Sequence, residues 1–162
     1  MSKLQGKILI VDDDKDVLVT AKMFLKQNFS EIIIEDNPEE IPNYLKKYNI
    51  EVIILDMNFK PGVTNGNEGL FWLKEILKID PNMCVLMNTA YGDIEIAVEA
   101  MKIGASEFIV KPWQGEKLLA TVTAIYKLSK SRKKILKLQH TKNLLDQEIN
   151  KEYTQIISKS KS

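Results

Sequence analysis

Short apolar runs alternate along this chain with longer segments in which apolar residues recur at helical spacing. The runs are rich in Ile, Val and Leu, have the length of strands, and lie at about 7–12, 32–34, 51–56, 83–88 and 106–110. The spacing between and after the runs predicts helices at about 14–28, 38–48, 68–78 and 93–103, and from about 115 onward. Strands that alternate with helices indicate βαβ units with right-handed crossovers, so the pattern predicts an α/β fold with a parallel sheet.

Several of these elements carry local signals. The acids of Asp14-Lys15-Asp16 can cap the first helix, and Asn37-Pro38 suits the start of the second, with Asn at the cap and Pro in the first turn. Pro42 either marks the true first turn of that second helix or distorts it, so its boundaries stay loose. Residues 51–56 are nearly all apolar, as expected of a central parallel strand. Gly104 suits the position just after a helix end.

Composition places the chain among ordinary globular proteins. Its 162 residues suit one domain with a core plus an appendage, and 44% of them are hydrophobic. The sequence lacks a run of roughly 18 apolar residues that would span a membrane, and its N-terminus lacks the apolar segment of a secretory signal. We therefore expect a cytoplasmic location. Cys84 has no second cysteine to pair with and is expected to be a buried small hydrophobic residue.

Polar residues follow four of the predicted strands. Asp12 and Asp13 end the first strand and Asp56 ends the third, while Thr89 and Lys111 follow the fourth and fifth. Carboxylates at strand ends suit Mg²⁺, which prefers oxygen ligands and keeps several waters. A lysine and a hydroxyl are groups that can hold a phosphoryl group. The pattern therefore predicts a site for phosphate and a divalent cation.

Each of these residues also has a plainer interpretation. An acidic run that caps a helix accounts well for Asp14 and Asp16 but poorly for Asp12 and Asp13. A lone lysine such as Lys111 is usually a solvated surface residue. The prediction of a site therefore depends on the whole set and not on any single residue.

The set, in this order, resembles the receiver domain of bacterial two-component response regulators over residues 1–128. The resemblance implies a flavodoxin-like (βα)5 fold with strand order 2-1-3-4-5. In that order the topological switch point lies between strands one and three, where ligands bind outside the carboxyl ends of the strands. These are the strands that end in Asp12, Asp13 and Asp56.

The resemblance also implies roles for the acids. Asp56 is the expected phospho-acceptor, since a carboxylate can form an aspartyl phosphate. Asp13 and Asp56 are expected to bind Mg²⁺ directly, Asn58 through its backbone carbonyl, and Asp12 through a water. Lys111 is expected to contact the phosphoryl oxygens, and its bond to Pro112 is expected to be cis.

Thr89 and Phe108 match the family's switch residues. Thr89 is expected to hydrogen-bond the phosphoryl group, and Phe108 to turn inward when Thr89 moves; the plainer interpretation of Phe108 is an ordinary core residue. Asn58 and Gly92 fill the positions that tune hydrolysis, and neither offers a strong general base. We therefore expect a phosphorylated state that lasts at least minutes.

The C-terminal part differs from the rest in charge and pattern. Residues 1–115 carry a net charge of −6 and residues 116–162 one of +7. Two heptad series run along this part, and six of their nine positions are apolar: Leu128, Ile135, Lys142, Ile149 and Ile156, and Ser131, Leu138, Leu145 and Glu152. Residues 129–162 are therefore expected to form a helical linker or a short, dimeric coiled coil that frays into a polar tail. A partly disordered linker is the alternative.

The extension also bears on the type of regulator and its output. A basic cluster lies at Lys127, Lys130, Arg132, Lys133, Lys134 and Lys137. These residues spread around the helix and no DNA-reading motif follows, so no direct contact with nucleic acid is expected. The run Thr89-Ala90-Tyr91-Gly92-Asp93 and the long linker resemble the nitrogen-regulator type, in which an ATPase and a DNA-binding domain follow. The sequence has no glycine-rich phosphate loop, so the chain is either a fragment of such a regulator or acts alone.

The leading hypothesis is thus a receiver in a two-component phosphorelay, and not an enzyme beyond its own phosphotransfer and slow dephosphorylation. A sensor histidine kinase would phosphorylate Asp56. Phosphorylation would then control either dimerisation, through the receiver face or the linker heptads, or an output domain that regulates transcription. One alternative is a phosphatase of the haloacid dehalogenase kind, a family that requires a second aspartate at the position occupied here by Asn58. A constitutive coiled-coil adaptor with an unused acid pocket is another.

Overall fold

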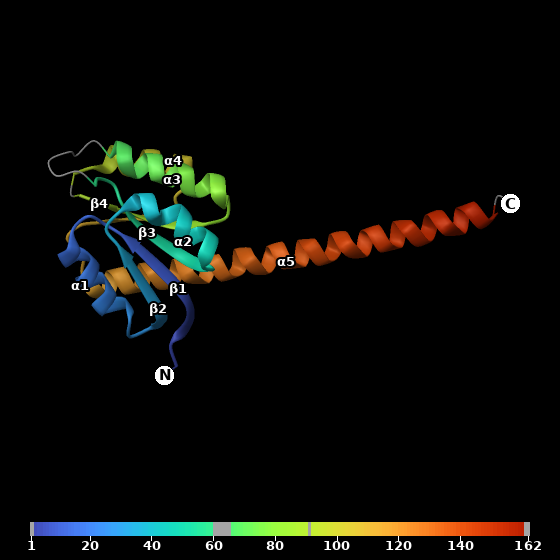
Figure 1. The fold of residues 1–162 in the computed structure, drawn as a ribbon, viewed down its shortest axis with the longest axis horizontal. Helices are drawn as coiled ribbons and strands as arrows, with labels where there is room; N and C mark the ends of the chain where they lie inside the picture. The colour runs from blue at the N-terminus through green and yellow to red at the C-terminus, as the bar shows by residue number, and fades with distance from the viewer. Residues whose placement is uncertain (1, 60–65, 91, 161–162) are drawn as a thin grey trace. The chain divides into compact units, whose positions relative to one another are not determined.

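A computed structural model describes residues 2–59, 66–90 and 92–160 (Figure 1). Its five-stranded sheet is parallel throughout, with the order β2-β1-β3-β4-β5. The strands are β1 (Leu4–Val11), β2 (Phe29–Glu35), β3 (Ile50–Asp56), β4 (Cys84–Thr89) and β5 (Glu107–Val110). The predicted fold class and strand order are confirmed.

Helices connect the strands and continue past the last one. They are α1 (Lys15–Leu25), the 3₁₀ helix η1 (Pro38–Glu40), α2 (Ile41–Lys47), α3 (Asn67–Ile79), α4 (Ile94–Ile103) and α5 (Gly115–Ser160). Figure 1 shows α2, α3 and α4 on one side of the sheet and α1 with the first turns of α5 on the other. The predicted C-terminal helical extension is therefore present.

Alternate residues of the strands supply two apolar cores. Ile8 and Ile10 face α1 and α5, whereas Leu9 and Val11 face α2, α3 and α4. Every residue of β3 is buried, as expected of a central strand covered on both faces. Cys84 is fully buried, as predicted. The two cores hold the strand ends in fixed positions.

Capping residues set the helix starts. Asp14 caps α1 by accepting from the backbone N–H groups of Asp16 and Val17, and Asn37 caps η1 by accepting from Glu39, as predicted. The single helix predicted at 38–48 is instead a 3₁₀ turn followed by α2. Pro42 lies in the first turn of α2, where its missing N–H costs no hydrogen bond.

Other boundaries differ from the prediction by a few residues. β1 begins at Leu4 and β2 at Phe29, earlier than their apolar runs, because polar residues occupy exposed positions of both strands. The first helix ends at Leu25 and not at residue 28. Residues 60–65, between the strand and the helix predicted at 51–56 and 68–78, and Tyr91 lie outside the described residues.

The chain divides into two compact units, residues 1–129 and 130–162. In the first, Leu118, Val122 and Ile125 of α5 are buried. The Tyr126 hydroxyl donates to the Gln5 carbonyl over 2.5 Å. The Ser129 hydroxyl donates to a carboxylate oxygen of the buried Glu51 over 3.0 Å. This unit therefore includes the first four turns of α5.

The second unit is helical from residue 130 to Ser160. Its large apolar side chains are mostly exposed. Within the described part of the chain, no helix has both the length and the apolar character that crossing a membrane would require.

Candidate functional site

Three carboxylates meet where β1 and β3 end. Asp56 is the last residue of β3 and is 8% exposed, and Asp12 directly follows β1 and is 1% exposed. Asp13 is exposed beside them. Ligand atoms of the three carboxylates lie within 4.8 Å of one another. Parallel pairing of β1 with β3, Val11 opposite Leu55, brings these residues from distant parts of the sequence to one edge.

Lys111 completes the cluster. Its side-chain nitrogen lies 2.8 Å from Asp12 Oδ2 and 3.1 Å from Asp56 Oδ1. Its backbone N–H donates to the Thr89 carbonyl over 2.7 Å, and its peptide bond to Pro112 is cis, as expected. The strand ends of β1, β3 and β5 thus supply acids and one amine to a single site.

Backbone N–H groups hold the buried carboxylates in place. Asp12 Oδ1 accepts from the N–H of Asp14, and Asp56 Oδ1 accepts from that of Met57, each over 2.9 Å. The start of α3 lies close to the end of β3 at Gly69, whose N–H donates to the Met57 carbonyl over 2.9 Å. A Cβ on Gly69 would lie 2.5 Å from the Met57 Cα, so α3 can approach the end of β3 only with glycine there.

The cluster carries more negative than positive charge. Burial, and then the charge of Asp12, raise the pKa of Asp56 to about 7, although Lys111 opposes this. Burial and Asp12 also raise the pKa of Asp13. For Lys111, burial acts to lower the pKa, but Asp12 and Asp56 outweigh it and the pKa is raised. One ammonium group therefore leaves these acids undercompensated, and an oxygen-rich, anionic set of this kind fits a hard divalent cation such as Mg²⁺.

The other predicted site residues lie on neighbouring elements. Thr89 is buried at the end of β4, and its hydroxyl donates to the Ile109 carbonyl of β5 over 3.4 Å. Phe108 is partly buried in β5 and packs on the core beneath α3 and α4. The side-chain oxygen of Asn58 accepts from the Gly66 N–H over 2.8 Å. In this form the Thr89 hydroxyl is directed to β5 and not to Asp56.

Comparison with known proteins identifies the family. Residues 8–123 match the response regulator receiver domain. The chain belongs to this family. Members are typically phospho-accepting switches without enzymatic activity, they function in two-component signalling with histidine kinases, and an acid triad of this kind is typical of their Mg²⁺ site.

Individual relatives agree with this assignment. The chain is 31% identical to the chemotaxis protein CheY of Thermotoga maritima, over 76% of this chain and 98% of that one. It is 44% identical to the N-terminal signal receiver domain of a response regulator from Bacteroides fragilis, with a TM-score of 0.69 over 76% of this chain and 98% of that one. NtrX from Brucella abortus is 26% identical, with a TM-score of 0.74 over 83% of this chain and 30% of its own.

Two residues of this receiver's site were missed by the sequence analysis. The indole N–H of Trp113 donates to the side-chain oxygen of Asn88 over 2.9 Å, and Asn88 is buried in β4 opposite Asp56. This bond ties the segment after Lys111 to the strand that ends in Thr89. An asparagine inside a buried strand needs a partner, and that was the available signal.

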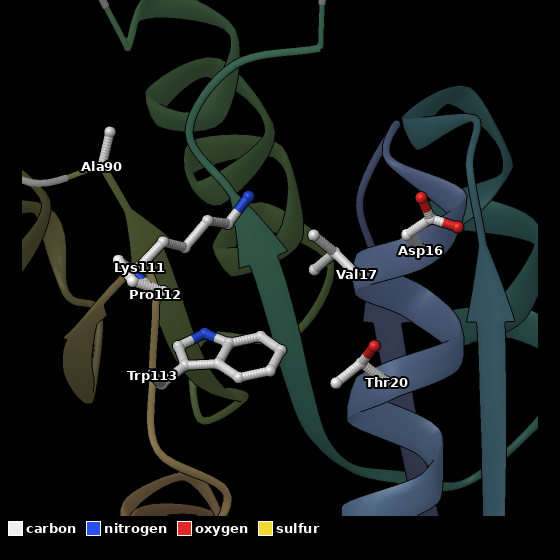
Figure 2. Close-up of a pocket in the computed structure, with 7 residues that line it drawn as sticks. All are labelled: Asp16, Val17, Thr20, Ala90, Lys111, Pro112 and Trp113. Carbon is white, nitrogen blue, oxygen red and sulfur yellow. The ribbon is translucent and has the colours of Figure 1, made fainter.

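A cavity of about 480 Å³ lies beside Lys111. Figure 2 shows Lys111 and the Trp113 ring on one wall and Val17 and Thr20 of α1 on the other. The cavity is largely apolar next to a charged cluster. It therefore offers space for a planar group beside the carboxylates.

Proposed function

We propose that this receiver accepts a phosphoryl group on Asp56 from a phosphohistidine of a sensor kinase. The observation that carries the proposal is the ion-paired cluster, in which Lys111 bridges Asp12 and Asp56 at the end of β3. Asp12 and Asp56 are both paired with Lys111 and close to the other carboxylates, and Asp56 is assigned as the acceptor because its place at the end of β3 matches the phospho-acceptor of the receiver family.

The proposed step is a displacement at phosphorus. A carboxylate oxygen of Asp56 forms the new O–P bond as the P–N bond of the phosphohistidine breaks, and the imidazole nitrogen keeps the electron pair. Phosphoryl transfer depends mainly on positioning and charge stabilisation. The Met57 N–H fixes Asp56, and Lys111 supplies positive charge to the phosphoryl oxygens. The cavity beside Lys111 gives the imidazole a place to lie.

Residues at the same edge would hold Mg²⁺. We assign Asp13 and Asp56 as direct ligands, the backbone carbonyl of Asn58 as a third, and Asp12 as a ligand through water. When bound, Mg²⁺ neutralises charge on the carboxylates and on the incoming phosphoryl group. Lys111, which pairs with Asp12 and Asp56, would turn from these acids toward the phosphoryl oxygens.

Thr89 and Phe108 would transmit the change. The 3.4 Å hydrogen bond from the Thr89 hydroxyl to the Ile109 carbonyl is long and therefore weak. A charged phosphoryl oxygen is a stronger acceptor for the same hydroxyl. Movement of Thr89 toward Asp56 vacates space beside β5, and Phe108, which is only partly buried, can turn into it.

The output is proposed to be control of dimerisation or of an attached domain in transcription regulation, in the cytoplasm. The nitrogen-regulator type is supported by the run around Thr89, by the long α5 and by the similarity to NtrX, a chain more than three times as long as the matched part. The receiver is residues 1–128 and the linker 129–162 in this proposal. The extension serves as a dimerising linker and not as a nucleic-acid contact.

Intact mass spectrometry tests the phospho-acceptor. The full chain is incubated with a small phosphodonor and Mg²⁺, and we expect the mass of one phosphoryl group to be added and to persist for minutes. Asp56→Asn should add none, whereas Asp36→Asn, an exposed acid just after β2, should behave as the parent. A constitutive adaptor would add no phosphoryl group in any of these chains.

A further inference from the structure

The second unit carries a stripe of exposed apolar side chains along α5. Leu138 and Leu145 are each 59% exposed, Ile149 is 62% exposed and Ile156 is 65% exposed. They recur at spacings of seven, four and seven, so they follow one face of the helix. Side chains this exposed on one face indicate a surface that a partner covers.

Two charged residues interrupt the stripe. Lys142 lies between Leu138 and Leu145, and Glu152 between Ile149 and Ile156, at positions where the heptad pattern calls for apolar residues. Both side chains are exposed. Any partner helix that covers the whole stripe must also accommodate one positive and one negative charge.

A second copy of the same helix accommodates them only in one orientation. In a parallel, in-register pair each seam residue faces its own copy, so Lys142 faces Lys142 and Glu152 faces Glu152. In an antiparallel pair, a seam residue of one series faces a residue of the other series. With the two-fold axis at Gln147, Lys142 faces Glu152.

The same antiparallel register also matches every apolar position. Leu145 faces Ile149, and Leu138 faces Ile156, so the pair has four apolar layers, two at its centre and one at each end, and two layers of opposite charge between them. We propose that residues 138–156 form an antiparallel two-helix coiled coil with a second copy of this chain, in which Lys142 of each copy pairs with Glu152 of the other. The proposal specifies the linker dimer proposed above and does not depend on phosphoryl transfer at Asp56.

Two features oppose this orientation and are weaker than the charges. Ile at the first heptad series and Leu at the second is a combination common in parallel dimers, and it contributes to packing in either orientation. Asp146 and Glu148 flank the midpoint and would each approach their own copy across the axis. Both are exposed, so water and salt screen that repulsion, whereas seam charges are largely covered.

Disulfide trapping in the full chain distinguishes the orientations. Leu145→Cys and Ile149→Cys chains, one of them tagged, are mixed and oxidised; the buried native Cys84 does not interfere. An antiparallel pair brings residue 145 of one chain against 149 of the other, so the mixed disulfide should dominate. Disulfides that join 145 to 145 or 149 to 149 would show a parallel pair and overturn the proposal. Failure of any disulfide to form, with a monomeric mass in solution, would also overturn it.

Charge reversal gives an independent test by sedimentation. Lys142→Glu and Glu152→Lys should each weaken dimerisation of the full chain by roughly tenfold, and the double variant should restore it. The two residues lie about 15 Å apart along one helix, so coupling between them must act across the dimer. If the effects of the two changes simply multiply, Lys142 and Glu152 do not meet and the antiparallel register is wrong. Phosphorylation of the same variants at Asp56 is measured in a separate experiment and reports on the receiver alone.

Discussion

The receiver unit buries its apolar side chains and gathers charge at one edge, whereas the extension exposes its apolar side chains and spreads charge along a helix. In the receiver, the apolar residues of β1 and β3 form a rigid frame around Asp12 and Asp56. In the extension, the side chains of Leu145 and Ile149 are mostly exposed. The first unit can fold without a partner, but the second leaves its apolar face without cover.

The difference shows two uses of charged residues. Within the receiver, the fold holds like charges together in a partly buried site, which costs folding free energy. Binding of Mg²⁺ would lower that cost by neutralising the carboxylates. Along the extension, each exposed charge costs little in a lone helix. Such charges matter only when a partner approaches, and they then select its orientation.

The largest change in stability should come from removing the negative charge of Asp56. Asp56→Asn is expected to stabilise the Mg²⁺-free protein at pH 8 by on the order of 2 to 4 kcal/mol. The pKa of Asp56 is raised to about 7 in the folded form, so between about pH 4 and 7 the folded protein keeps a proton that the unfolded chain has lost. Stability therefore falls as the pH rises through that window, and asparagine avoids the loss.

Urea unfolding at pH 8 and pH 4 measures this effect. The stabilisation by Asp56→Asn should be largest at pH 8 without Mg²⁺ and should vanish near pH 4, where Asp56 is protonated. Asp14→Asn is a matched control, because asparagine caps α1 as well as aspartate does. A variant that is no more stable than the parent at pH 8 would show that Lys111 already compensates the charge.

A smaller effect, on Mg²⁺ affinity, is expected from changing Asp13. Loss of a residue that only supports a metal ligand lowers metal affinity by roughly 10- to 100-fold. Asp13→Asn removes a direct carboxylate ligand, so it should weaken Mg²⁺ binding by at least that much. Calorimetric titration with Mg²⁺ measures the change, with Asp36→Asn as the control. Unchanged Mg²⁺ affinity would remove Asp13 from the ligand set and leave Asp56 as the main acid.

The bond that the sequence did not reveal gives the next prediction. Trp113→Phe keeps an aromatic ring in the cavity wall but leaves the buried Asn88 oxygen without the indole donor, and should cost about 1 to 2 kcal/mol. Chemical unfolding of this variant is compared with that of Trp72→Phe, a partly buried ring on α3. Equal losses for the two variants would mean that ring packing, and not the bond to Asn88, matters at Trp113.

These cases show what the sequence could and could not supply. The acids at the ends of β1 and β3 were predictable, because parallel topology alone brings strand ends together. The bond between Asn88 and Trp113 was not, because it depends on side-chain directions between two segments far apart in the sequence. The raised pKa of Asp56 also depends on burial, which apolar pattern indicates for β3 but does not quantify.

The edge strand shows a similar limit. The predicted strand at 32–34 became β2, Phe29–Glu35, because the polar Ser30 and Glu31 are exposed and break the apolar run without breaking the strand. The helix at 38–48 was divided by Pro42, whose position in a first turn depends on where η1 ends. Such boundaries follow from tertiary contacts that an apolar pattern cannot resolve.

The smallest effect on stability is expected from removing the whole second unit. Deletion of residues 130–162 should change the unfolding free energy of the receiver by within about 0.5 kcal/mol, because Tyr126 and Ser129 keep their bonds to Gln5 and Glu51. A chain that ends at residue 124 should lose several times as much, since it lacks both bonds and the buried Ile125. Urea unfolding of both truncated chains at low concentration, where association does not contribute, tests this. A large loss in the first deletion would mean that the extension stabilises the receiver itself, and the contrast between a self-sufficient unit and a partner-dependent one would fail.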